Sequence, residues 1–332
     1  MESNIDVVIP WVDGNDPEWQ KEFIKYSPQL NNRDSNTVIR YRDWNNLQYL
    51  FRGIEVFMPW VRKVHLITCG QKPKWLNVDA PKLNFVQHED FIPKEYLPTF
   101  SVRPIELNIH RIADLSEQFI YFNDDFFVLK PMKPTDFFRK GLPLDIAALN
   151  VLMVKSPRCI VMANNTLMIN KHFNKKKVIR QNISKWLKLS YGRYLLKSLS
   201  LMQWGFFSGF QDSHLPQPYL KRTFEDVWIE CEDVLKETTQ HRFRDISDVN
   251  QSLMRYWQIV SGEFSPYNVF RYRKYYEIAD DNIDSICKEI SNPRKPLFIL
   301  NDSDHIFQFE MCKDKLNAAF SEIFPHKSSF EL

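Results

Sequence analysis

Short apolar runs that end in acidic or amide residues recur along this chain of 332 residues, and this pattern constrains the fold more than any other feature. Residues 5–11, 63–68 and 119–122 each have the length and composition of a buried strand. Over residues 47–57, apolar positions recur at three- and four-residue steps, as in an amphipathic helix. Strands that alternate with helices predict an α/β fold with a mainly parallel sheet flanked by helices.

Further elements continue the alternation. We expect strands at 83–86 and 296–300 and helices over 103–115 and 219–262, with a last helix near the C-terminus. Asp43 is expected to cap the helix that follows it. In sheets of this kind ligands gather beyond the carboxyl ends of the strands, so the polar residues found there are candidates for a site.

The composition excludes several classes of protein. Five cysteines are an odd number and form no Cys-x-x-Cys pair, which argues against a disulfide framework or a zinc site. A formal net charge of +3 requires no nucleic-acid partner, and we expect none. The N-terminus lacks a secretory signal pattern and no stretch reaches roughly 20 apolar residues, so a cytoplasmic location is expected.

A basic stretch that carries Trp and Tyr, residues 173–200, is interpreted as part of a helical insertion. It divides the chain into 1–172, 173–210 and 211–332. Two interpretations of this stretch remain open. It is either a solvated helix face or an interfacial helix, which would hold the protein near anionic lipid and a lipid-linked acceptor at the inner face of the plasma membrane.

Three acidic clusters follow predicted strands. They are Asp13-Gly14-Asn15-Asp16, Asn123-Asp124-Asp125 and Asn301-Asp302. Carboxylate oxygens suit hard cations such as Mg²⁺, which usually also bridge to substrate phosphates. For each cluster an ordinary turn is the alternative interpretation.

Other candidates lie outside these clusters. His214 precedes a helix whose start Pro216 or Pro218 would set, where it could meet an anion, although a structural role is the alternative. Glu106 and His110 are four residues apart and share a helix face, either in a site or as a surface ion pair. Arg244 could neutralise a phosphate or simply lie on the surface.

Taken together, these clusters resemble the Stealth family, which includes bacterial capsule and exopolysaccharide phosphotransferases and the animal N-acetylglucosamine-1-phosphotransferase. Residues 5–14, 40–132, 213–251 and 300–331 look like its four regions, in order. The motifs of the second region are Arg40-Tyr41-Arg42-Asp43, Ile105-Glu106, His110-Arg111-Ile112 and Tyr121-Phe122-Asn123-Asp124-Asp125. Ser101-Val102-Arg103-Pro104 departs from the family pattern, which leaves the substrate undefined.

The resemblance implies a Rossmann-like (GT-A-like) fold and a Mg²⁺ or Mn²⁺ cofactor. It implies transfer of hexose-1-phosphate or N-acetylhexosamine-1-phosphate from a UDP-sugar to a hydroxyl of a growing surface glycan, with release of UMP. The acceptor would be lipid-linked or a free oligosaccharide. The chemistry needs charge neutralisation and in-line placement more than covalent help.

The resemblance also assigns roles to residues. Catalysis falls to Asp124, Asp125, His214 and Arg244; substrate binding to Trp11, Asp13, Arg40, Glu106, His110, Arg111 and Asn123; and metal binding to Asp124, Asn301 and Asp302. Asp125, with Asp124 beside it, would take the acceptor proton or hold the cation. Arg244 would stabilise the diphosphate and His214 would serve as an acid or phosphate donor.

Two rival interpretations stay open. A metal-dependent glycosyltransferase would use the same donor but break the bond between sugar and phosphate and release UDP. A non-catalytic glycan-binding protein is the second rival, since 26 Phe, 13 Tyr and nine Trp could supply stacking surfaces.

Overall fold

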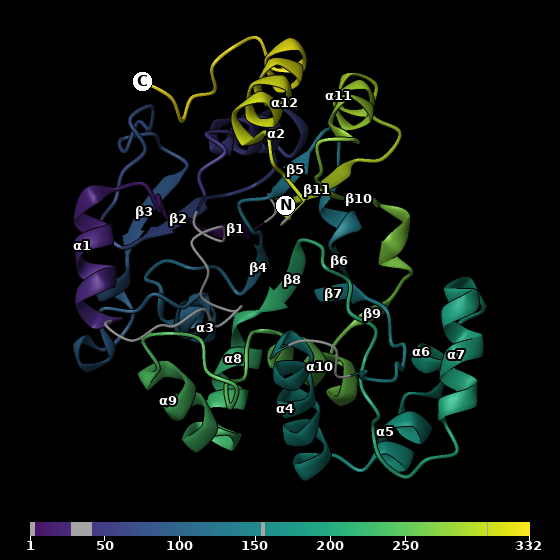
Figure 1. The fold of residues 1–332 in the computed structure, drawn as a ribbon. Helices are drawn as coiled ribbons and strands as arrows, with labels where there is room; N and C mark the ends of the chain where they lie inside the picture. The colour runs from purple at the N-terminus through teal and green to yellow at the C-terminus, as the bar shows by residue number, and fades with distance from the viewer. Residues whose placement is uncertain (1–3, 28–41, 154–156, 304) are drawn as a thin grey trace. The chain divides into compact units, whose positions relative to one another are not determined.

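The computed structural model describes residues 4–27, 42–153, 157–303 and 305–332 (Figure 1). The chain divides into two compact units, each assembled from separate stretches of sequence. Unit 1 consists of Met1–His88, Tyr121–Pro134 and Arg271–Leu332, and unit 2 consists of Glu89–Ile120 and Thr135–Phe270.

Three strands of unit 1 pair in parallel. They are β1 (Ile5–Pro10), β2 (Val64–Thr68) and β3 (Leu83–Gln87), and β2 pairs with both of the others. The residues of β2 are all buried, as expected for a strand covered on both faces. Two helices follow β1 in sequence, α1 (Pro17–Tyr26) and α2 (Leu47–Phe57).

The second sheet of unit 1 is mixed. It contains β10 (Arg273–Glu277), β11 (Leu297–Asn301) and β5 (Phe126–Val128), with β11 parallel to β10 and antiparallel to β5. Helices α11 (Ile283–Ser291) and α12 (Phe309–Ile323) pack against each other beside it (Figure 1).

Unit 2 contains the remaining strands. These are β4 (Gln118–Tyr121, whose last residue belongs to unit 1), β6 (Phe138–Arg139), β7 (Leu142–Asp145), β8 (Gln217–Leu220) and β9 (Ser265–Pro266). Strand β7 lies between β6 and β9 in a small sheet.

The core of unit 2 is built around α10 (Ser252–Ser261), which is buried along almost its whole length and packs on α4 (Pro157–His172). The other helices outside the basic stretch are α3 (Val102–Asn108), α8 (Lys221–Glu230) and α9 (Glu232–Gln240). Three more fall in the basic stretch; they are α5 (Lys175–Gln181), α6 (Ile183–Trp186) and α7 (Arg193–Leu201).

The predicted α/β class with mainly parallel strands is confirmed, and so are the strands expected at the acidic clusters. In the described part of the chain, no helix has both the length and the apolar character that a membrane span requires. The division at residues 172 and 210 stays a prediction.

Three local predictions are wrong. Asp43 does not cap α2: its carboxylate accepts the N–H of Asn45, and Asn46 occupies the N-cap position. The helix expected over 103–115 ends at Asn108 and passes into a 3-10 turn over Ile109–Arg111, after which the backbone becomes extended at Ile112, with a ψ of 126°. His214 precedes strand β8, so it does not lie at a helix N-terminus.

Candidate active site

The acidic clusters of unit 1 lie at the carboxyl ends of its strands. The N–H of Phe122 donates to the carbonyl of Val8 in β1, which places Asn123-Asp124-Asp125 at that end. The carbonyl of Asp125 in turn accepts the N–H of Leu300 at 3.0 Å. Pairing of β5 with β11 therefore brings the cluster at 123–125 beside Asn301-Asp302, although 176 residues separate Asp125 from Asn301 along the sequence.

Three carboxylates of this region lie close enough for their charges to interact. Asp124 is solvent-exposed, yet the protein atoms around it and the charge of Asp43 raise its pKa to about 6. Burial, and then the charge of Asp13, raise the pKa of Asp43 as well. A bound cation would offset the repulsion between these carboxylates, so the region suits a positively charged ligand.

Asp302 is oriented by Arg42. The guanidinium donates to both carboxylate oxygens, from Nη2 at 2.6 Å and from Nε at 3.1 Å, and Trp44 Nε1 donates at 3.3 Å. Arg42 also stacks over the Phe309 ring, 4.8 Å from its centroid. Burial raises the pKa of Asp302, and the paired Arg42 opposes that rise. A cation bound by Asp302 would therefore share this carboxylate with Arg42.

Replacing Arg42 by Lys is expected to lower kcat/KM by about 10- to 100-fold, because a lysine cannot hold both oxygens of Asp302 or stack on Phe309 in the same way. Steady-state kinetics at several Mg²⁺ concentrations measures this effect. If Arg42 positions Asp302 for the cation, the Mg²⁺ concentration for half-maximal rate rises too.

The matched control is Arg52→Lys. Arg52 forms an equivalent bidentate salt bridge with Glu331, through Nε at 2.8 Å and Nη2 at 2.6 Å. Neither residue belongs to the acidic clusters. Its replacement is expected to leave kcat/KM unchanged. Equal losses in both variants would show that the Arg42 effect is only structural.

The first cluster is held by a glutamine that the sequence did not single out. Gln71 accepts the N–H of Asp13 at 2.9 Å and donates to the Asp13 carbonyl and to the Asp16 carboxylate. Asp16 caps α1 through the N–H groups of Glu18 and Trp19, so the turn interpretation holds for that residue. The Asp13 carboxylate accepts the N–H of Asn15 and is half-buried, beside the half-buried Trp11.

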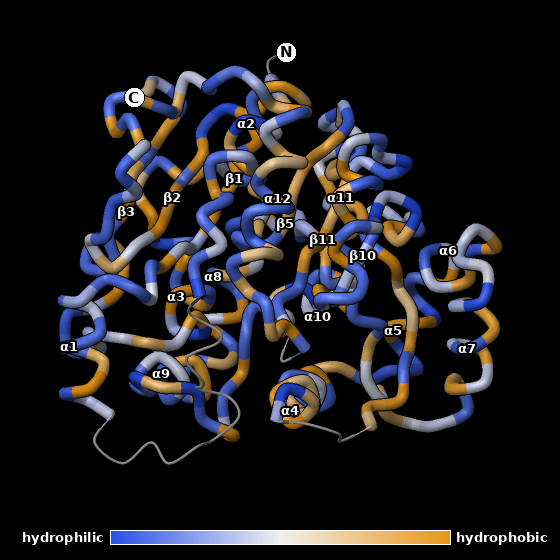
Figure 2. Tube along the Cα trace, turned by 45° about the horizontal axis from the view of Figure 1, so that its top comes forward, coloured by the Kyte–Doolittle hydropathy of each residue, from blue (hydrophilic) through white to orange (hydrophobic). Residues whose placement is uncertain are grey.

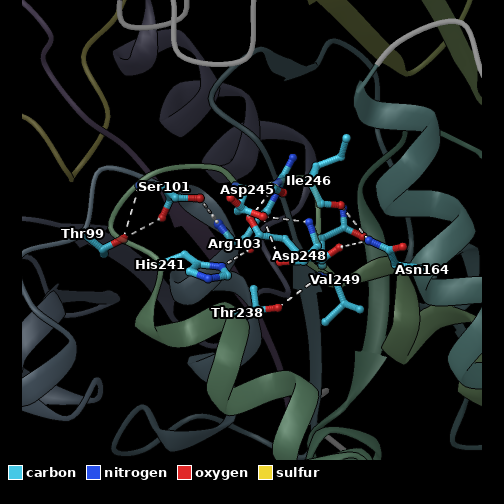
Figure 3. Close-up of polar contacts among 12 residues, drawn as sticks. Thr99, Ser101, Arg103, Asn164, Thr238, His241, Asp245, Ile246, Asp248 and Val249 are labelled. Atoms are coloured by element: carbon cyan, nitrogen blue, oxygen red, sulfur yellow. Dashed lines mark hydrogen bonds and ion pairs between the residues drawn. The ribbon is translucent and has the colours of Figure 1, made fainter. Parts of the chain in front are cut away.

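In unit 2, Arg244 lies on a loop that the buried carboxylate of Asp248 holds in place. Figure 3 shows the contacts of Asp248. Asp248 accepts from Arg103 at 2.5 Å, from His241 Nδ1 at 2.6 Å and from the N–H of Asp245 at 2.9 Å. Arg103 also donates to the Asp245 carbonyl.

The other side of this loop is held by Phe100. The Phe243 ring stacks on Phe100 at 5.1 Å, and the Phe100 N–H donates to the carbonyl of Arg242. The chain around Arg244 is thus fixed on both sides.

His214 lies on a second segment that is fixed in the same way. Asp145 and Arg255 are both buried and form a bidentate salt bridge, in which each hydrogen bond is 2.7 Å long. Arg255 also donates to the carbonyl of Gln211, and Gln217 donates to Asp145. The ion pair therefore holds both ends of the segment 211–217. His214 itself has a φ of 41°, a conformation that needs such support.

The cluster at 106–111 is more buried than expected. Burial and the charge of Arg111 lower the pKa of His110 to about 3, so the imidazole is neutral and no ion pair with Glu106 is expected. The His110 ring contacts Phe224 and Trp228, which are four residues apart on α8, and Arg111 stacks on Trp228 at 4.5 Å. His110 and Arg111 therefore pack against the aromatic residues of α8, and Glu106 and His110 do not form a surface ion pair.

Arg40, the remaining predicted site residue, lies outside the described residues. The others divide between the units, with the acidic clusters in unit 1 and Glu106, His110, Arg111, His214 and Arg244 in unit 2. Five residues that hold site loops were not predicted; they are Gln71, Asp145, Asp248, Arg255 and Arg42, of which only Arg42 fell within a motif.

Comparison with known proteins identifies the family. Residues 3–31 match Stealth protein CR1, conserved region 1, and residues 40–144 match Stealth protein CR2, conserved region 2. The chain is 40% identical over 329 residues to the capsular polysaccharide phosphotransferase WcwK of Streptococcus pneumoniae, covering 98% of each protein.

Two further relatives are similar over their whole length. The receptor polysaccharide phosphotransferase WefC of Streptococcus gordonii is 36% identical, with 100% of both chains covered. The exopolysaccharide phosphotransferase cps2G of Lactiplantibacillus plantarum is 36% identical, with 99% of this chain and 96% of the relative covered. A crystal structure of the galactosyltransferase LgtC aligns with 94% of this chain and 95% of its own, at 11% identity and a TM-score of 0.39.

The fold and the positions of the clusters define an α/β protein with acidic residues gathered at the ends of its strands. The extent of the similarity then fixes the family: the chain belongs to the Stealth family, and the three relatives named above are all polysaccharide phosphotransferases.

Proposed function

We propose that this protein is a sugar-1-phosphate transferase, which moves a hexose-1-phosphate or N-acetylhexosamine-1-phosphate from a UDP-sugar to a hydroxyl of a growing surface glycan. Full-length identity to polysaccharide phosphotransferases supports the reaction class. The observation that carries the assignment of the site is the exposed Asp124, whose pKa is raised by the protein atoms around it and by the charge of Asp43, a residue distant in the sequence.

The reaction balances without a further reactant. The acceptor oxygen attacks the phosphorus that bears the sugar, the bond between the two phosphates of the donor breaks, and UMP leaves. The sugar stays bonded to its phosphate, and the acceptor proton passes to a base. A carboxylate with a pKa of about 6, as in Asp124, suits that role near neutral pH. Asp125 is the alternative base.

The residues present fit a Mg²⁺ or Mn²⁺ ion. No group of three or more His, Cys, Asp or Glu side chains is arranged around a metal position in the part of the chain that the structure describes. Mg²⁺, however, is usually bound through one or two carboxylates together with substrate phosphates. Asn301, at the end of β11, and Asp302, which follows it, would hold the ion, and Asp124 would be a further ligand if Asp125 rather than Asp124 is the base. When bound, the ion would neutralise charge on the diphosphate.

The remaining candidates act on the donor. The guanidinium of Arg244 would form an ion pair with the diphosphate. His214 would donate a proton to the departing UMP as a general acid. Trp11, Asp13 and Asn123 at the strand ends would bind the nucleotide or sugar. A lipid-linked or oligosaccharide acceptor and a cytoplasmic location belong to the same proposal.

A panel of UDP-sugars tests the proposal. UDP-N-acetylglucosamine, UDP-N-acetylgalactosamine, UDP-galactose and UDP-glucose are each incubated with Mg²⁺ and a short acceptor glycan, and the released nucleotide is identified by chromatography. We expect UMP with one donor, and no release once EDTA removes the cation. Release of UDP would instead assign the protein to the glycosyltransferases. Glycan binding without release of either nucleotide would favour the binding module.

A further inference from the structure

One part of unit 2 contains no acidic residue over a long stretch of sequence. From Pro157 to Gln211 there is no aspartate or glutamate, whereas 55 residues at the average frequency of this chain would include about seven. The same stretch contains ten basic residues. They are Arg158, Lys171, Lys175, Lys176, Lys177, Arg180, Lys185, Lys188, Arg193 and Lys197. A solvated surface normally mixes both signs of charge, so the charge bias of this stretch suits an anionic environment.

Large hydrophobic side chains are exposed on the same stretch. Eighteen such side chains are exposed among the described residues, and seven of them fall between residues 183 and 206. They are Ile183, Leu187, Leu189, Leu196, Leu199, Trp204 and Phe206. Leu189 is 89% exposed, Phe206 72% and Leu196 70%. We refer to these seven side chains, with Arg193 and Lys197, as the basic apolar face.

Helix α7 shows how the two kinds of residue share one surface. Ser198 and Leu201 point inward, and the Ser198 hydroxyl accepts the N–H of Leu149. Leu196 and Leu199, three residues apart, point outward beside the exposed Arg193 and Lys197. Hydrophobic and hydrophilic residues accordingly alternate along α7, which lies beside α6 in both views (Figures 1 and 2).

The exposed aromatic residues are presented by a fixed loop. Lys175 is buried, and its ammonium donates to the carbonyls of Leu201 at 2.6 Å and Trp204 at 3.0 Å. Asn170 forms two hydrogen bonds with the backbone of Phe207, one through each side-chain atom. The backbone on either side of Phe206 is therefore held, and its ring is exposed because the fold directs it outward.

From this we propose that the basic apolar face binds the surface of a membrane that contains anionic lipids. Leu, Trp and Phe side chains would enter the boundary between headgroups and acyl chains, and the basic residues would pair with the headgroups. A soluble polyanion would be recognised by the charges alone and gives no reason for the exposed Leu, Trp and Phe. The charge bias and the apolar exposure together therefore favour a lipid surface.

Vesicle co-sedimentation tests the proposal with the full chain. We expect the protein to sediment with phosphatidylcholine vesicles that contain phosphatidylglycerol and much less with phosphatidylcholine alone, and we expect added salt to weaken the binding. Replacing Arg193 and Lys197 by Gln is expected to weaken binding on the order of 20-fold, at roughly fivefold per charge. Replacing Leu189 and Leu196 by Ser is expected to weaken it at least as much.

The control is Ile229→Ser, which removes an exposed hydrophobic side chain from α8, outside the basic apolar face. It is expected to leave vesicle binding unchanged. Circular dichroism establishes that each variant is folded. Equal sedimentation with neutral and anionic vesicles would overturn the proposal. So would vesicle binding that the leucine variant leaves unchanged, which would indicate recognition of charge alone.

Discussion

Replacing Asp124 by Asn is expected to abolish turnover and leave the protein folded. The substitution keeps the size of the side chain but removes a carboxylate that would act as base or cation ligand, and either role is worth a factor of about 10³ or more in kcat/KM. Because Asp124 is exposed, its replacement should change the free energy of unfolding by no more than about 0.5 kcal/mol. Nucleotide release and thermal unfolding, measured on the same preparation, check both statements.

Two further variants test whether the loss of activity is specific to the acidic cluster. Asp125→Asn is expected to lose activity to a similar extent, whereas Asp79→Asn, an exposed aspartate of unit 1 outside the acidic clusters, is expected to lose none. If the residual activity of the Asp124 variant rises with excess Mg²⁺, Asp124 is a cation ligand rather than the base. An Asp124→Asn protein with more than a tenth of normal kcat/KM would contradict the assigned role of this carboxylate.

Replacing Arg255 by Met is expected to destabilise the protein by about 3–5 kcal/mol, because it leaves the buried Asp145 without its ionic partner. Since Arg255 also fixes the carbonyl of Gln211, activity should fall together with stability as the segment that carries His214 loosens. Urea unfolding followed by circular dichroism measures the loss.

A double replacement separates the cost of the lone charge from the value of the pair. Asp145→Leu combined with Arg255→Met is expected to be substantially more stable than Arg255→Met alone, because no unpaired charge stays buried. Arg222→Met, which breaks exposed ion pairs with Glu117 and Glu263, is the control and should cost no more than about 1 kcal/mol. An Arg255→Met protein as stable as this control would contradict the structural role of the buried pair.

The sequence predicts the α/β class and the position of the acidic clusters because both depend on local patterns. Apolar runs with polar ends mark β1, β2, β4 and β11 directly, and the strands bury those runs. Strand order is not local information. That Asp125 lies beside Leu300 follows only from the antiparallel pairing of β5 with β11.

The residues that hold the site loops could not be predicted from the sequence, because their partners are also distant along the chain. Arg103 and Asp248 are 145 residues apart, and Asp145 and Arg255 are 110 apart, so no periodicity links the partners. The wrong predictions for Asp43 and His214 are of another kind. Helix α2 begins at Leu47 after Asn46, too far along the chain for Asp43 to be its cap. The segment after His214 forms strand β8 before α8 begins at Lys221, so the prolines there do not start a helix.

The central claim is that the sugar keeps its phosphate, and an isotope placed in the donor tests it most directly. The preferred UDP-sugar is labelled with ³²P in the phosphate next to the sugar and incubated with acceptor and Mg²⁺, and glycan and nucleotide are then separated. The account predicts that the label enters the glycan and that the released UMP is unlabelled. Label retained in released UDP, with an unlabelled glycan product, would contradict the account and identify a glycosyltransferase.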